Sequence, residues 1–142
     1  MCNSKDRDSI CLKKIGNIFI IGFNFIQQIT NFYQSTQNAC TFIRDINSFA
    51  ISNNYEIRSC MASAKSATSL LISKSTLKFD VYSNKIKIMI SLLKSAQKYE
   101  LIIQPKMKDF ISPEIISEIE EVEITQFNSD SEWGYKINYA KK

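Results

Sequence analysis

Four cysteines, Cys2, Cys11, Cys40 and Cys60, are the residues of this chain whose chemistry depends most on their spacing. No Cys-x2-Cys pair occurs and the chain contains no histidine, so the usual ligand patterns of a zinc site are missing. Thiols form stable disulfides in oxidising compartments and stay reduced in the cytosol. The cysteines therefore indicate covalent cross-links or small buried apolar groups, and we expect no metal centre.

The absence of histidine also removes the commonest general base and every histidine-dependent triad. The nearest thing to a cluster of acid–base residues is a C-terminal run of glutamates: Glu114, Glu118, Glu120, Glu121 and Glu123. Three of them follow the solvated face of a predicted helix, and glutamates near a helix start stabilise its dipole. We therefore predict a structural role for the run, no cofactor and no enzymatic activity.

The net charge of +4 is unevenly distributed along the chain. Residues 51–110 carry 10 basic and 4 acidic groups, whereas residues 111–142 carry 3 and 7. This asymmetry could steer a partner of complementary charge, or it could be a solvated lysine face, which we favour. The lysines are dispersed and only three arginines occur, so nucleic-acid binding is not expected.

Composition favours a helical domain that carries these residues. Hydrophobic residues make up 44% of the 142 residues, while glycine (3) and proline (2) are scarce, which suits a single domain of long helices. The apolar stretch GNIFIIGFNFI is too short to span a bilayer, so no membrane association is expected.

Apolar residues at three- and four-residue steps predict four helices. The expected ranges are 16–49, 54–75, 80–103 and a shorter helix that begins at Pro113. The first helix should end near AISNN, and Ser112-Pro113 is a good helix start. The segment IEEVEITQF could instead be a strand, because apolar and acidic residues alternate in it.

The predicted fold class is all-α, an antiparallel four-helix bundle preceded by an N-terminal helical hairpin. The single domain would comprise the hairpin at residues 1–15, the bundle at residues 16–127 and a tail at residues 128–142.

Four segments resemble, in this order, the plant invertase and pectin methylesterase inhibitors and the pollen allergens related to them. CNSKDRDSICLKKI resembles the family's N-terminal hairpin, and YQSTQNACTFIRDI its first bundle helix. YEIRSCMASAKSATSLL resembles the helix that begins at the third cysteine, and VYSNKIKIMISLL resembles the third helix. The resemblance covers about residues 2–103 and implies a disulfide between Cys2 and Cys11 that closes the hairpin.

The chain departs from the family at its other cysteines. Tyr99 occupies the place of the family's fourth cysteine, so Cys60 loses its usual partner, and Cys40 is additional. Cys40 and Cys60 could form a bridge between adjacent helices or remain two buried free thiols, and we favour the thiols.

The resemblance implies a secreted inhibitor in the apoplast or cell wall, although this chain shows no signal peptide. Its protein partner would be a pectin methylesterase or an acid invertase, whose active-site cleft the second and third helices would occlude. The expected contact residues are Ala62, Lys65, Ser66, Ser69, Tyr82, Ser83 and Asn84. None of them is acidic, unlike the contacts of the esterase-binding members. The alternative is a diverged, allergen-like interaction module that has no inhibitory activity.

Overall fold

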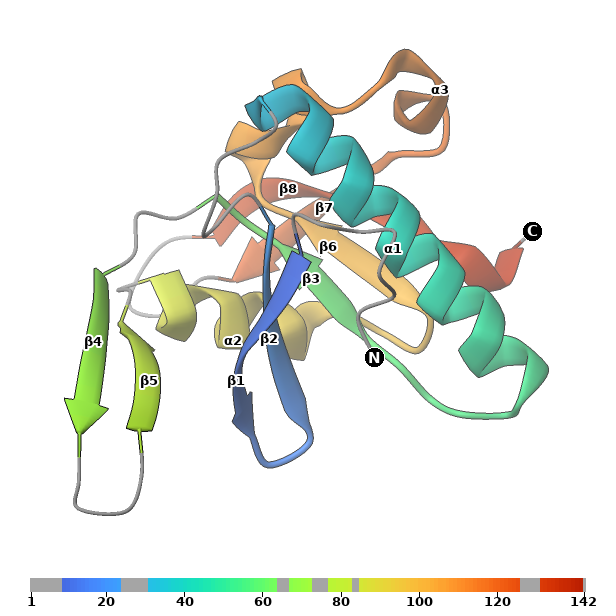
Figure 1. The fold of residues 1–142 in the computed structure, drawn as a ribbon. Coiled ribbons are helices and arrows are strands. Elements are labelled where there is room, and N and C mark those ends of the chain that lie inside the picture. The colour runs from blue at the N-terminus through green and yellow to red at the C-terminus, as the bar shows by residue number, and fades with distance from the viewer. Residues whose placement is uncertain are drawn as a thin grey trace.

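The computed structural model describes residues 9–23, 31–63, 67–72, 77–82, 85–125 and 131–141. The fold is mixed α/β, and the predicted all-α four-helix bundle is wrong (Figure 1). The strands are β1 (Ser9–Ile15), β2 (Ile18–Phe23), β3 (Ser59–Met61), β4 (Ala67–Ile72), β5 (Leu77–Tyr82), β6 (Glu100–Ile103), β7 (Glu120–Thr125) and β8 (Ser131–Asn138). The helices are α1 (Phe32–Ser52), α2 (Lys85–Ser95) and α3 (Pro113–Ile116), with 3-10 turns η1 (Pro105–Phe110) and η2 (Tyr139–Lys141).

A four-stranded sheet in the order β3-β6-β8-β7 forms the centre of the fold. Strand β3 runs parallel to β6, and the other two pairs are antiparallel. All four residues of β6 are buried, and their side chains alternate between the two faces of the sheet. Leu101 and Ile103 belong to the core with α1, whereas Ile102 packs with Leu92 of α2 and with Ala96, which follows that helix. The sheet is therefore a middle layer between α1 and α2.

Helix α1 is the longest element, and polar residues define both of its ends. The side chain of Asn31 accepts a hydrogen bond of 2.7 Å from the backbone N–H of Gln34, which caps the N-terminus. At the other end Asn54 adopts φ 58°, a left-handed conformation that asparagine tolerates well. The predicted helix end near AISNN is confirmed.

The first half of the predicted helix at residues 16–49 is a β-hairpin instead. Ile15 pairs with Ile18 across a two-residue turn, and Gly16 has φ +57° there. A glycine with positive φ at the first turn position is typical of the hairpin turns that match the twist of strands. The isoleucines on both sides of Gly16-Asn17 favour strands over a helix.

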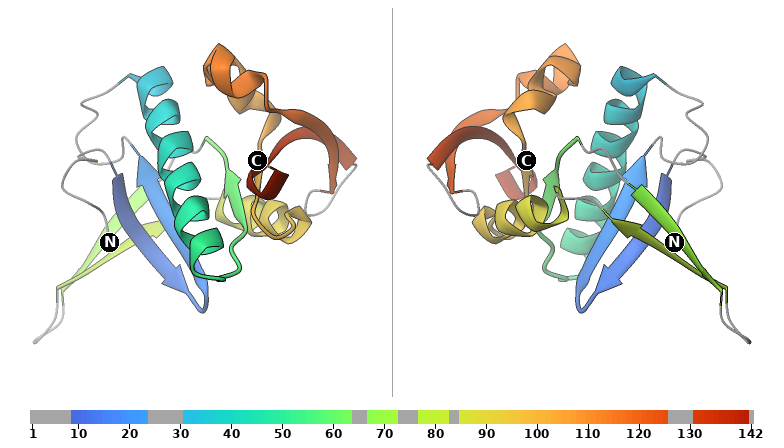
Figure 2. Two further views of the ribbon diagram at one scale, coloured as in Figure 1. Left: turned by 90° about the vertical axis from the view of Figure 1, so that its right-hand side faces the viewer. Right: turned by 90° about the vertical axis from the view of Figure 1, so that its left-hand side faces the viewer.

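The predicted second and third helices are also largely wrong. Residues 54–75 contain strands β3 and β4, and residues 80–103 contain the end of β5, helix α2 and strand β6. Strands β4 and β5 form a separate antiparallel hairpin that extends away from the rest of the fold (Figure 2). Within these ranges only α2 is a helix, and its Leu92 is buried while Ile88, four residues earlier, packs partly buried against the same cluster.

The C-terminal third of the chain adds two strands to the central sheet. The start predicted at Ser112-Pro113 is confirmed, but α3 ends after four residues. The following segment is strand β7, which confirms the strand alternative for IEEVEITQF. Strand β8, in the predicted tail at residues 128–142, lies between β6 and β7.

Candidate functional site

The three described cysteines are free thiols. Cys11 is exposed on β1 rather than in a disulfide, so the predicted Cys2–Cys11 disulfide is wrong; Cys2 itself lies outside the described residues. Cys40 is buried on α1, and Cys60 lies on β3, where it pairs with Ile102 of β6. The resemblance placed Tyr99 at the position of the usual partner of Cys60. In the strand register of the structure, Cys60 instead lies opposite Ile102.

Neither of the two inner thiols is a nucleophile at neutral pH. Burial raises the pKa of Cys40 from 9.0 to about 11 and that of Cys60 from 9.0 to about 12. The Cys60 Sγ also lies 3.2 Å from the carbonyl oxygen of Met89, to which the protonated thiol donates a hydrogen bond. Because the thiolate is the reactive form, both thiols serve as small core groups.

The three described residues among those predicted to bind a partner do not lie on helices. Lys65, Ser66, Ser83 and Asn84 lie outside the described residues. Ala62 follows β3, while Ser69 and Tyr82 lie on the paired strands β4 and β5. Since the second and third helices of the bundle do not exist, the surface that these seven residues were expected to share is not formed as predicted.

The predicted glutamate run is divided between α3, the following turn and β7. Glu114, Glu118, Glu120 and Glu121 are exposed, and the side chain of Glu123 is not described. Sequence reasoning missed a different carboxylate, Glu100, which is 3% exposed in the central sheet.

Glu100 has the partners that a buried carboxylate requires. It accepts a 2.9 Å hydrogen bond from the backbone N–H of Gln97, and Lys136 Nζ lies 3.5 Å from its Oε1. Lys136 Nζ is also 3.7 Å from Oε2 of Glu120. These bonds fix the segment after α2 to the sheet, so Glu100 has a structural role.

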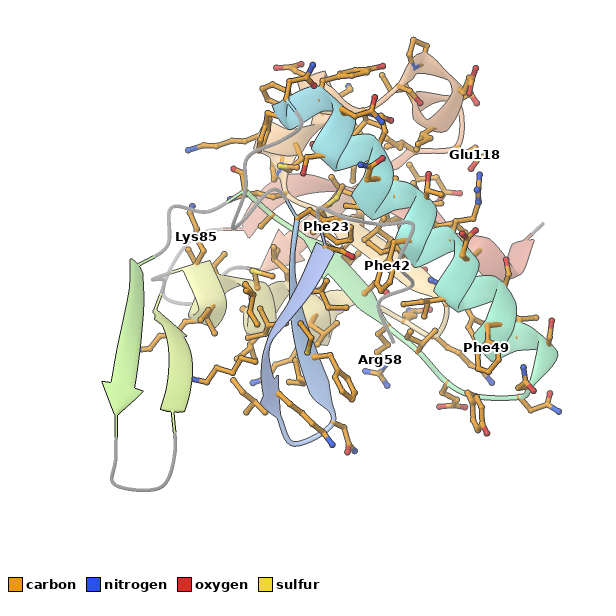
Figure 3. The ribbon with its side chains drawn as sticks, in the orientation of Figure 1. Phe23, Phe42, Phe49, Arg58, Lys85 and Glu118 are labelled. Atoms are coloured by element: carbon orange, nitrogen blue, oxygen red, sulfur yellow. The ribbon has the colours of Figure 1, made fainter. Side chains whose placement is uncertain are left out.

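The surface feature that stands out is a row of apolar side chains along one flank of α1. Phe42, Ile46 and Phe49 are spaced four and three residues apart, so they are neighbours on the helix surface. Phe23 of β2 packs edge-on against Phe42, with ring centroids 5.6 Å apart and an interplanar angle of 66°. Figure 3 shows this pair side by side and Phe49 farther along the helix. We call Phe23, Phe42, Ile46, Phe49 and Tyr55 the apolar flank.

The outer end of the apolar flank is exposed to solvent. Phe49 is 59% exposed and Tyr55 is 61% exposed, yet their rings lie against one another, with centroids 6.3 Å apart and an interplanar angle of 32°. The left-handed Asn54 turns the chain so that Tyr55 follows α1 directly. Single exposed apolar residues are ordinary, whereas a contiguous row that ends in an aromatic pair is typical of interaction sites.

Charged residues border this flank in pairs of opposite sign. Lys98 Nζ lies 3.1 Å from Oε1 of Glu56, the residue that follows Tyr55. Asp45, one helical turn before Phe49, lies 3.4 Å from Nε of Arg44. These two pairs carry no net charge, and an apolar centre with a polar border is the usual anatomy of a protein interface.

The sequence carried a signal for this flank. Two sets of apolar residues recur at three-, four- or seven-residue steps in this helix: Ala39, Ile43 and Ala50, and Phe42, Ile46 and Phe49. Together they are more apolar residues than one buried face can hold. The structure buries Ala39 and Ala50 and leaves Phe49 exposed.

Comparisons with known proteins do not assign this chain to a family. No family model and no curated protein matches the chain. None of the described helices is long and apolar enough to cross a membrane.

Proposed function

We propose that this chain is a protein-binding module that contacts its partner through the apolar flank of α1. The observation that carries the proposal is the exposed aromatic pair Phe49–Tyr55, at 59% and 61% exposure. Large aromatic side chains dominate binding energy at interfaces, because they desolvate a wide area and lose few rotamers.

The partner that fits this flank presents an apolar segment with little net charge. Two acidic and two basic residues at the border lie in pairs, Glu56 with Lys98 and Asp45 with Arg44. Exposed pairs of this kind contribute little energy and steer no strongly charged partner. Binding should therefore be driven by apolar burial and depend only weakly on salt.

Inhibition of a pectin methylesterase or an acid invertase in the apoplast stays a prediction. The bundle on which it depended is wrong, and four of its seven contact residues lie outside the described part of the chain. A protein-binding module without catalysis agrees with the alternative that the sequence left open. Purified samples of the two enzymes are therefore defined candidates in the binding test.

The test is affinity capture with three immobilised forms of the full chain: the wild type, Phe49→Ser/Tyr55→Ser and Tyr33→Ser. Tyr33 is the matched control, since it is an aromatic residue of α1 with 44% exposure on the opposite flank. We expect a protein that the wild type and the control retain and that the double variant loses. Its measured affinity should fall about 30-fold or more in the double variant, the effect of losing an aromatic hot spot.

Two other outcomes are informative. Partners that all three forms retain equally would contradict the proposal. Sedimentation of the purified chain separates binding to another protein from self-association. A dimer that the double variant abolishes would assign the apolar flank to a second copy and would overturn the proposed partner.

A further inference from the structure

The opposite flank of α1 contains a cavity that the protein-binding proposal does not use. Its volume is about 180 Å³, and it lies between α1, α3 and η2. The lining residues are Cys40, Thr41, Arg44, Glu114, Ile115, Glu118 and Tyr139. Figure 3 shows Glu118 on the side of α1 away from Phe42. The space is far larger than a single water molecule needs.

Two lining groups are neutral at physiological pH. Burial raises the pKa of the Cys40 thiol to about 11. Burial also raises the pKa of the Tyr139 phenol, an effect to which the nearby Cys40 and Glu118 add and which Arg44 opposes. Tyr139 is 9% exposed, so its protonated hydroxyl is a fixed polar group in the wall. Together with Thr41, the wall offers two hydroxyl groups that can accept or donate hydrogen bonds.

The formal charge around the cavity is negative. Glu114 and Glu118 contribute two carboxylates, and Arg44 contributes one guanidinium. Asp45 lies 3.4 Å from Nε of Arg44 but does not line the cavity. The lining therefore carries a formal charge of −1 whichever pairs form, which favours a cationic ligand over an anionic one.

The cation that fits is organic rather than a metal ion. Among the described residues, no three histidine, cysteine or acidic side chains converge as metal ligands. Ile115 and the neutral Cys40 give the cavity an apolar wall beside its carboxylates. A primary ammonium group donates three hydrogen bonds and has an alkyl chain that such a wall can cover.

We propose that this cavity binds a primary alkylammonium group, from either a free aliphatic amine or a lysine side chain. Glu114 and Glu118 accept hydrogen bonds from the ammonium group, and the alkyl chain packs against Ile115. The site is distinct from the apolar flank, because none of its lining residues belongs to that flank.

The test is a titration of the full chain with n-butylammonium, followed by the backbone amide shifts in NMR spectra. We expect saturable shifts at residues 41, 44 and 114–118, with a dissociation constant on the order of 10 mM for so small a ligand. Butyrate, with a similar alkyl chain and the opposite charge, serves as the control ligand and should cause no saturable shift there. Nα-acetyl-lysine amide as a second ligand distinguishes a lysine side chain from a free amine, and saturation by either supports the proposal.

Matched variants separate the site from general surface charge. Glu114→Gln/Glu118→Gln should weaken n-butylammonium binding by about tenfold, because both carboxylates that accept hydrogen bonds from the ammonium group lose their charge. Glu121→Gln changes an exposed carboxylate of β7 outside the cavity lining and should leave binding unchanged. No saturable shift with either amine, equal shifts with butyrate, or equal loss in the Glu121 variant would overturn the proposal.

Discussion

The two flanks of α1 belong to one helix and one core, yet they differ in chemistry. On one side Phe42, Ile46 and Phe49 continue the apolar surface of the β1–β2 hairpin. On the other side Thr41 and Arg44 face the glutamates of the α3 segment across a cavity. The buried residues between the flanks, among them Ala39, Cys40 and Ala50, hold the helix in place.

This difference determines how each flank can bind. Burial of apolar area is only weakly affected by salt, whereas exposed ionic contacts are screened at high ionic strength. A protein partner on the apolar flank and an ammonium group on the charged flank should therefore respond to salt in different ways. Substitutions in the shared core should affect both flanks, whereas substitutions on one flank should affect that flank alone.

The largest expected effect comes from the shared core. Leu101 is 0% exposed in β6 and packs with α1 in the larger core cluster. Leu101→Ala should lower the free energy of unfolding by about 3 kcal/mol, because it removes buried methyl groups and leaves a cavity. Urea unfolding followed by circular dichroism measures this change.

An exposed aliphatic residue provides the control for this core change. Ile116 of α3 is 39% exposed, so Ile116→Ala should change the free energy of unfolding by less than about 0.5 kcal/mol. Equal effects of the two substitutions would contradict a core centred on β6.

A second prediction concerns the charged flank and alkaline pH. The pKa of Cys40 is raised from 9.0 to about 11 in the folded chain, so the unfolded chain loses this proton first. The stability that depends on the protonated thiol is complete below pH 9 and is lost as the pH rises toward 11. Between neutral pH and about pH 10, the wild type should lose about 1 kcal/mol more stability than Cys40→Ala.

Thermal unfolding at the two pH values measures this difference. Cys11→Ala, at an exposed thiol on β1, is the control and should follow the wild type. An equal loss of stability between the two pH values in Cys40→Ala and in the wild type would contradict this prediction. It would mean that unfolding does not make the Cys40 thiol easier to ionise.

The third prediction concerns the hairpin beside the apolar flank. Gly16 has φ +57°, and a Cβ at this position would have no neighbour within 4 Å. Gly16→Ala should therefore destabilise the chain by about 1 kcal/mol through backbone strain alone. Gly16→Asn should cost less, because asparagine tolerates positive φ. Hydrogen exchange of the β1–β2 amides should increase in the alanine variant, and unchanged exchange would contradict this turn.

The sequence predicted local features of the fold better than its architecture. The end of α1 and the start of α3 follow from asparagine, serine and proline residues that act within a few positions. The hairpin at Gly16-Asn17 was predictable as well, since isoleucines flank a two-residue glycine turn. Strand β6 was harder to predict, because a short apolar run such as LII suits a buried helix and a buried strand equally.

The candidate site was less predictable, because tertiary contacts define it. Periodicity places Phe42 and Phe49 on α1, but only the packing of Ala39 and Ala50 against the sheet leaves that flank outside the core. The cavity joins Arg44 to Glu118 and Tyr139, residues far apart in the sequence. The disulfide that the resemblance implied for Cys11 is wrong, because Cys11 lies in a strand and is unpaired among the described residues.

The most direct test of the protein-binding proposal is the affinity of the selectively captured partner at two ionic strengths. Isothermal titration would compare the wild type, Tyr33→Ser and Phe49→Ser/Tyr55→Ser in about 0.1 M and about 1 M salt, where the Debye length falls from about 10 Å to about 3 Å. We predict similar affinities for the first two forms at both salt concentrations, and a loss of about 30-fold or more in the double variant at each. An affinity that collapses in high salt, or that the double variant retains, would contradict binding through the apolar flank.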